Sequence, residues 1–124
     1  MDEDTIIDLL QDLGPVRIRR MFGGLGVFLD GLMIAVTGYG GELYIKADAL
    51  NDQYFRDAGS TRFTYLKAGG KPFVMGYWKL PDEALDDPVQ AVIWAKYGLE
   101  AAQRAARKKT ATGKRVSQMP EGAA

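Results

Sequence analysis

Arg-Arg-Met-Phe-Gly-Gly-Leu-Gly-Val-Phe, residues 19–28, is the stretch of this sequence that decides the fold. Glycine adopts backbone angles that other side chains disfavour, so Gly23, Gly24 and Gly26 predict a tight reversal between two strands. A phosphate-binding loop is the alternative. Such loops lead into a helix, whereas this one leads into a strand-like run with no Gly-Lys-Ser/Thr after it. We therefore expect a structural turn, with Met21, Phe22 and Phe28 in the core.

The segments on both sides of this turn predict further strands. Residues 16–22 alternate between apolar and basic side chains until Arg20 falls on the apolar side. Two explanations stay open: a bulge at Arg20 that restores the alternation, or an Arg20 that is partly buried against a carboxylate. Asp30-Gly31 is a strong hairpin signal between strands at 27–29 and 32–37, and residues 42–47 form another strand. Short turns between these strands predict an antiparallel meander.

Three helices and a second hairpin are expected around this meander. Helical spacing of apolar residues predicts a helix over residues 2–13, which Gly14 and Pro15 end. A second helix begins with Asp48 as N-cap, ends at Gly59 and presents the face Leu50, Tyr54, Phe55 and Ala58. A hairpin over 62–66 and 73–80 follows.

The last helix begins at Asp87-Pro88 and runs to about Lys108. Its predicted apolar stripe consists of Val89, Val92, Ile93, Tyr97, Ala101, Ala102 and Ala105. The whole order, α–β(3–4)–α–β(2)–α, predicts an α+β fold in which helices cover an antiparallel sheet in two layers. We expect one domain over residues 1–108 and a disordered basic and polar tail over 109–124.

The composition excludes several chemistries. The chain has 124 residues with no cysteine and no histidine, which removes disulfides, thiolate catalysis and the commonest acid–base group. Ser60 and Ser117 lack a nucleophile-elbow pattern, and the acidic residues have turn or cap roles or no metal-binding spacing. We therefore expect no catalytic, cofactor-binding or metal-binding residue, no cofactor and no enzyme activity.

Charge is segregated along the chain although the net charge is zero. The acidic first helix has no cation, and a basic run near the end includes Lys108, Lys109, Lys114 and Arg115. This run predicts either a solvated helix end, the favoured interpretation, or a nucleic-acid contact. Arg17, Arg19 and Arg20 are candidate contacts for a protein partner or an anion, and the alternative is pairing with the acidic helix.

No basic, apolar leader and no apolar run long enough for a bilayer are present, so we expect a cytoplasmic protein without membrane contact. The second hairpin is apolar on both sides, which predicts a homodimer face that includes Val74 and Trp78. The alternative is that the long last helix and the loops cover this face. Aromatic residues on the hairpin, Tyr77 among them, are interpreted as core and not as a stacking platform for nucleic acid.

The motif Arg19-Arg20-Met21-Phe22-Gly23-Gly24, with Gly26, resembles the N-terminal domain of the TfoX/Sxy family of competence regulators. Residues 30–33, 43–48, 70–72 and 75–78 agree with that family in order and spacing. The resemblance implies a two-layer α+β fold similar to the secretion-chaperone-like class. It also implies regulation of DNA-uptake genes through contacts with a transcription-related protein, without catalysis. Full-length members carry a second, helical domain, so we expect this chain to be a stand-alone N-terminal domain.

Overall fold

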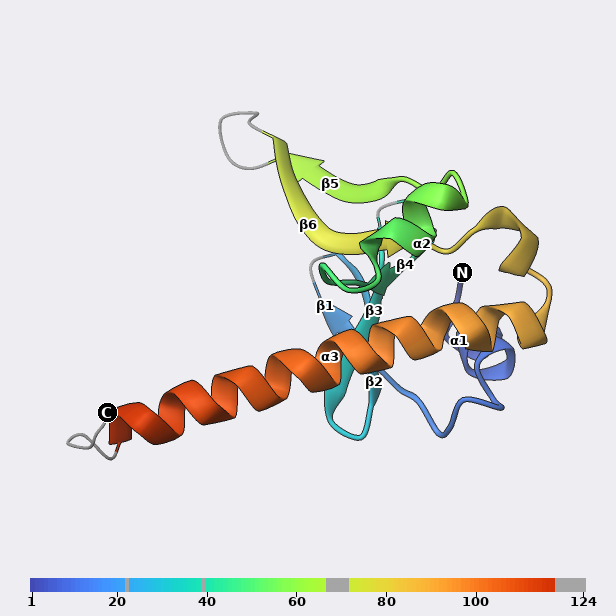
Figure 1. Cartoon of the computed structure of the whole chain (residues 1–124). Coiled ribbons are helices and arrows are strands. Elements are labelled where there is room, and N and C mark those ends of the chain that lie inside the picture. Colours follow the sequence, from blue (N-terminus) through green and yellow to red (C-terminus); the bar gives the residue numbers. More distant parts are fainter. Residues whose placement is uncertain (22, 39, 67–71, 118–124) are drawn as a thin grey trace.

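Helices pack on one side of a curved sheet in this protein (Figure 1). The computed structural model describes residues 1–21, 23–38, 40–66 and 72–117, with side chains except at 65–66, 72–75 and 109–117. The elements, in chain order, are α1 (Glu3–Leu9), β1 (Arg17–Met21), β2 (Gly24–Leu29), β3 (Leu32–Thr37), β4 (Leu43–Lys46), α2 (Asp52–Asp57), β5 (Arg62–Leu66), β6 (Pro72–Lys79), the 3-10 turn η1 (Asp82–Ala84) and α3 (Pro88–Ser117). This order confirms the predicted α+β class.

These strands join in a single antiparallel sheet of order β1-β2-β3-β4-β6-β5. The predicted meander supplies β1 to β4, and the predicted hairpin supplies β5 and β6. These two parts meet where β4 pairs with β6, with Tyr44 opposite Lys79 and Ile45 opposite Trp78. The sheet therefore continues from the glycine motif at one edge to the second hairpin at the other.

The glycine motif turns the chain as predicted, but its glycines have different roles. Gly23 has a φ of 73°, which suits the turn between β1 and β2. Gly24 and Gly26 instead lie within β2, where the space for a side chain is missing. A Cβ on Gly24 would lie 2.5 Å from the Thr37 carbonyl oxygen, and one on Gly26 would lie 2.4 Å from the Met21 sulfur.

Of two further predictions for β1 to β3, the hairpin at Asp30-Gly31 is confirmed and the bulge at Arg20 is wrong. Asp30 and Gly31 both have positive φ, 53° and 79°, and form the expected hairpin turn between β2 and β3. A bulge at Arg20 is wrong, because β1 pairs with β2 without a shift in register. The irregularity lies in the next pair of strands, between Val27 and Phe28.

The core lies on the side of the sheet that the helices cover. It combines apolar residues of α1, α2 and α3 with sheet residues such as Val27, Ile45 and Trp78. Met21 and Phe28 are half-buried and lie outside this core, contrary to prediction, because alternation along β1 and β2 turns them to the opposite face. Phe22 lies outside the described residues.

Small residues of α3 come closest to the sheet, while the larger Val92, Trp94 and Leu99 of the same helix are buried or pack against the core. The buried positions of this helix include Ala91, Ala95, Gly98 and Ala102. Gly98 comes so close to β3 that a Cβ would lie 2.6 Å from the Ile34 carbonyl oxygen. The predicted stripe is therefore wrong at Val89, Ile93 and Ala105, which are exposed.

The helix ends also test the predictions. The Asp87 carboxylate accepts hydrogen bonds from the main-chain N–H groups of Val89 and Gln90, which confirms it as the N-cap of α3. Asp48 is not the N-cap of α2, because that helix begins three residues after the predicted start, with Asn51 at the cap position. The last helix does not end near Lys108 but continues to Ser117, and residues 118–124 lie outside the described part of the chain.

Candidate functional site

None of the described helices covers one face of the sheet, and we call it the open sheet face (Figure 1). Helices α2 and α3 both contact the other face, through the Phe55–Trp78 ring pair and through Gly98 beside Ile45. Register and alternation assign side chains of every strand to the open sheet face. These are Arg17, Arg19, Met21, Phe28, Met33, Val36, Tyr44, Lys46, Phe63, Tyr77 and Lys79.

Charge on the sheet is of one sign. In the strands that the structure describes, no aspartate or glutamate occurs, and the charged residues are Arg17, Arg19, Arg20, Lys46, Arg62 and Lys79. The acidic residues of the described part of the chain lie in helices, turns and loops instead. Four of the six strand cations belong to the open sheet face, which is therefore basic although the whole chain is neutral.

Cations and aromatic rings are in contact on the open sheet face. The Arg19 guanidinium lies 5.7 Å from the centroid of the Phe28 ring, and the Lys46 ammonium lies 5.3 Å from that of Tyr77. The Tyr44 and Phe63 rings lie 4.8 Å apart. Arg19 and Lys46 therefore each have a cation–π contact with a ring on the same face of the sheet.

Burial sets the ionisation of the two tyrosines on this face. It raises the pKa of the Tyr77 phenol. It also raises the pKa of the Tyr44 phenol, to which the nearby Glu42 charge adds, while Lys79 acts in the opposite direction. Both phenols therefore stay neutral at physiological pH and can donate a hydrogen bond.

Arg17, Arg19 and Arg20 are all exposed, so the predicted burial of Arg20 is wrong. Among the described residues, the ion pairs are Lys79–Asp82 and Arg104–Asp48, and neither involves these arginines or the acidic helix α1. Arg20 lines a shallow hollow at the glycine turn with Met21, Gly23, Gly24 and Leu25. The strand alternation separates Arg20 from Arg17 and Arg19, which share the open sheet face.

A second exposed surface lies on the helices, and we call it the apolar stripe: Leu50, Tyr54, Val89, Ile93 and Tyr97. Val89, Ile93 and Tyr97 follow one another at intervals of four on α3, which places them on one side of the helix. Tyr97 stacks on Tyr54 of α2, with ring centroids 4.9 Å apart. Leu50 is 71% exposed and Val89 is 68% exposed, so the stripe is open to solvent.

Polar contacts hold the loop before α2 against α3, beside the apolar stripe. Arg104 donates two hydrogen bonds to the Asp48 carboxylate, from Nε at 2.7 Å and from Nη2 at 2.9 Å. The Arg104 hydrogen bond lowers the pKa of the Asp48 carboxyl group. The buried Asn51 amide donates to the Tyr97 carbonyl oxygen, and its own oxygen accepts from the Asp48 N–H. These contacts are structural and explain Asp48 without a catalytic role.

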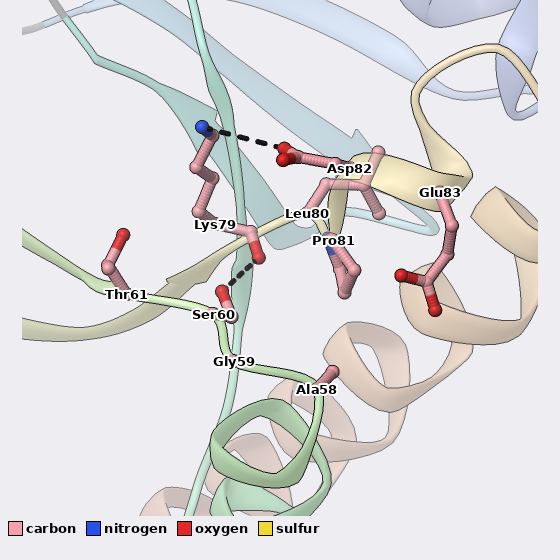
Figure 2. A pocket seen from close by; sticks show the side chains of 9 residues that line it. All are labelled: Ala58, Gly59, Ser60, Thr61, Lys79, Leu80, Pro81, Asp82 and Glu83. Atoms are coloured by element: carbon pink, nitrogen blue, oxygen red, sulfur yellow. Dashed lines mark hydrogen bonds and ion pairs between the residues drawn. The ribbon is translucent and has the colours of Figure 1, made fainter.

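A cavity between the α2–β5 loop and the β6–η1 loop contains Ser60, one of the two serines of the chain (Figure 2). It measures about 200 Å³. Ser60 Oγ donates its hydrogen bond to the Lys79 carbonyl oxygen, so the hydroxyl already has a structural partner. Lys79 Nζ lies 3.7 Å from the Asp82 carboxylate, which is largely exposed. The cavity brings together no group that could activate Ser60.

The residues predicted for a dimer face and for a nucleic-acid tail are not among those that define the two exposed surfaces. Trp78 is only 5% exposed, stacks on Phe55 and donates from Nε1 to the Asp52 carboxylate, which removes it from the predicted dimer face. Tyr77 is buried as expected. Lys108 is exposed on α3, while the side chains of Val74, Lys109, Lys114 and Arg115 lie outside the described ones.

Membrane-spanning helices and metal sites are both missing from the described residues. No helix there combines the length and apolarity that crossing a membrane requires. No group of three or more acidic residues gathers there as a metal site would need.

Sequence reasoning missed both exposed surfaces. Helical spacing predicts Leu50, Tyr54, Val89 and Ile93 as members of apolar helix faces, but all four are exposed. The signal that could have found the apolar stripe is the run of small residues at 91, 95, 98 and 102, which indicates a close helix–sheet contact on that side. The signal for the open sheet face is the absence of acidic residues from every expected strand core.

Comparison with known proteins agrees with the motif. A family model described as the TfoX N-terminal domain matches residues 8–102. A curated relative, the DNA transformation protein TfoX1 of Aliivibrio fischeri, is 31% identical over 65 residues, which are 52% of this chain and 31% of the relative. The matched part thus spans less than a third of that relative. The family model matches well over half of this chain, and the chain therefore belongs to the TfoX N-terminal domain family.

Proposed function

We propose that this protein is a non-catalytic regulatory module that controls DNA-uptake genes in the cytoplasm through contacts with a transcription-related protein. The family and the name of the Aliivibrio fischeri relative, a DNA transformation protein, support the link to competence. The chain matches only part of that relative, so the activity of the longer protein is part of the proposal.

The apolar stripe is the observation that carries this proposal. Val89, Ile93 and Tyr97 share one side of α3, and Tyr97 stacks on Tyr54 of α2. Leu50 is exposed in the loop before α2, which the Asp48–Arg104 ion pair holds against α3. Exposed apolar patches with aromatic residues are typical of protein interfaces. Conversely, the groups that catalysis would need are not gathered in the cavity of Figure 2.

The test combines a cellular and a biochemical measurement. Deletion of the gene should lower expression of DNA-uptake genes, and the wild-type chain should restore it. The double variant Val89→Asp/Ile93→Asp should fail to restore expression and should lose a transcription-related protein from pull-downs. Ile7→Asp on α1 is the matched control, because Ile7 and Ile93 are 41% and 43% exposed. Unchanged expression after deletion, or full activity of the double variant, would contradict the proposal.

A further inference from the structure

We propose that the open sheet face binds single-stranded nucleic acid. The proposal concerns a different surface from the apolar stripe and a different class of partner, so it stands independently of the function proposed above. Its basis is the charge of the sheet: the described strands carry six cations and no acidic residue, and four of these cations belong to the open sheet face. A polyanion is the partner that this arrangement attracts.

One row of paired residues crosses the open sheet face and has a cation at each end. Arg19 lies opposite Gly26, Gly26 opposite Val36, Val36 opposite Tyr44 and Tyr44 opposite Lys79. This row crosses β1, β2, β3, β4 and β6, a width of about 19 Å at the usual strand spacing of about 4.8 Å. Arg17 and Lys46 flank the row. An extended strand lying across the sheet would therefore meet Arg19 at one end of the row and Lys79, which also contacts Asp82, at the other.

Aromatic side chains distinguish a nucleic acid from an acidic peptide as the occupant. Phe28, Tyr44 and Phe63 are only half-buried, although they lie on strands and outside the main core. Bases stack on such rings whatever their sequence, and an arginine held over a ring, as Arg19 is over Phe28, offers a planar surface as well. Acidic peptides gain nothing comparable from the rings.

Gly26 has no side chain that would project from the open sheet face. Its neighbours at the position where a Cβ would lie are Met21, Phe28 and Met33, all members of the open sheet face. Ring and thioether groups therefore meet over Gly26 with no side chain of its own between them. This flat, apolar centre with cations around it is the geometry that unpaired bases require, whereas the stacked bases of a duplex cannot reach it.

The experiment measures fluorescence anisotropy of the full chain with labelled 12-nucleotide oligo(dT) and oligo(U), titrated at several salt concentrations. We expect binding that weakens with salt and exceeds binding to a duplex of equal length. Arg17→Glu/Arg19→Glu should lower affinity at least tenfold and reduce the salt slope by about 0.7 for each phosphate that is no longer neutralised. Phe28→Leu, which keeps the residue apolar, should lower affinity about fivefold or more without changing the slope.

Controls separate this surface from the rest of the molecule. Lys96→Glu/Arg107→Glu makes the same charge change on exposed positions of α3 and should leave binding unchanged. Circular dichroism melts show whether each variant is folded. Equal loss in the α3 variant, stronger binding to the duplex, or displacement by poly-glutamate as effective as by unlabelled oligonucleotide would overturn the proposal. Comparison of the DNA and RNA oligonucleotides identifies the preferred nucleic acid.

Discussion

At the scale of single residues, the glycines of the motif are required for two different reasons. One needs a positive backbone φ angle, and two lie where a side chain would have no space. Gly23 has a positive φ in the β1–β2 turn. Gly24 and Gly26 lie in the strand that follows and are excluded from carrying a Cβ by neighbours on the same sheet. The family motif is thus architectural at its glycines, and its exposed arginines are what remains for binding.

Gly24→Ala should destabilise the protein more than Gly26→Ala. The atom in the way of a Cβ at Gly24 is the Thr37 carbonyl oxygen, which belongs to the backbone. At Gly26 the atoms are ends of flexible side chains, the Met21 and Met33 sulfurs among them. Chemical denaturation should show a loss of about 2–3 kcal/mol for Gly24→Ala and about 1 kcal/mol for Gly26→Ala. The reverse order would show that the backbone gives way more easily than the methionines.

Asp48→Asn should lower the free energy of unfolding by about 1–2 kcal/mol at pH 7, because Arg104 loses a charged acceptor. The Asp48 pKa is lowered from 3.8 in the folded state. Its contribution is therefore present above pH 3.8 and is lost as the pH falls through the lower folded value. Denaturation at pH 7 and at pH 3 should show the wild type and the variant converging in acid. Asp8→Asn, on the exposed side of α1, is the control, and a difference that does not change with pH would contradict the explanation.

At the scale of elements, the packing of α3 on β3 and β4 determines which side of the helix is exposed. Alanine and glycine let the helix come close to the sheet, and this contact turns Val89 and Ile93 outward. The helix thus has two apolar sides: one faces the core and includes the small residues that touch the sheet, and the other exposes Val89 and Ile93 to solvent.

Gly98→Ala tests this contact because two effects oppose each other. Alanine favours a helix over glycine by about 1 kcal/mol. The added Cβ would lie 2.6 Å from the Ile34 carbonyl oxygen and 2.8 Å from Ile45 Cγ2. We expect the clash to dominate and thermal melting to fall. Ala105→Gly, at an exposed position of the same helix, should cost only the propensity, and a higher melting temperature for Gly98→Ala would mean that α3 lies farther from the sheet.

At the scale of the whole molecule, a chain of zero net charge has a sheet whose described strands carry cations and no acidic residue. This arrangement bears on the predicted homodimer, which remains a prediction. Two open sheet faces would bring the same cations together, and like charges at close range oppose association. The apolar stripe has no such charge among its members and is the surface through which a symmetric dimer could form.

Light scattering at micromolar concentration should therefore give a dimer mass for the wild type and for Arg17→Glu/Arg19→Glu. Val89→Asp/Ile93→Asp should give a monomer mass, because it introduces charges into the apolar stripe. A monomeric wild type would end the dimer prediction. Dissociation by the arginine variant alone would place the interface on the open sheet face instead.

Local signals were sufficient for the elements themselves. Two-residue alternation predicted the strands, Asp30-Gly31 and Gly23 predicted turns, and Asp87-Pro88 predicted the start of α3, because each depends on the backbone preferences of a few adjacent residues. The ends of helices were predicted less accurately where the N-cap residue had to be chosen from the sequence. Asp48 has the chemistry of an N-cap, yet its carboxylate binds Arg104 of α3, which is 56 positions away in the sequence and could not be inferred from the neighbouring residues.

What the sequence by itself determined is the family, the α+β class and the segregation of acidic and basic residues, all of which depend on residue identity and spacing. Only the tertiary structure decided which apolar residues are buried. Trp78 packs inward under α2, whereas Val89 and Ile93 stay in solvent, although all three are large and apolar. The reason is that burial depends on the closest approach of elements distant in the chain. Gly98 against Ile34 sets the orientation of α3, and with it the surfaces that remain for partners.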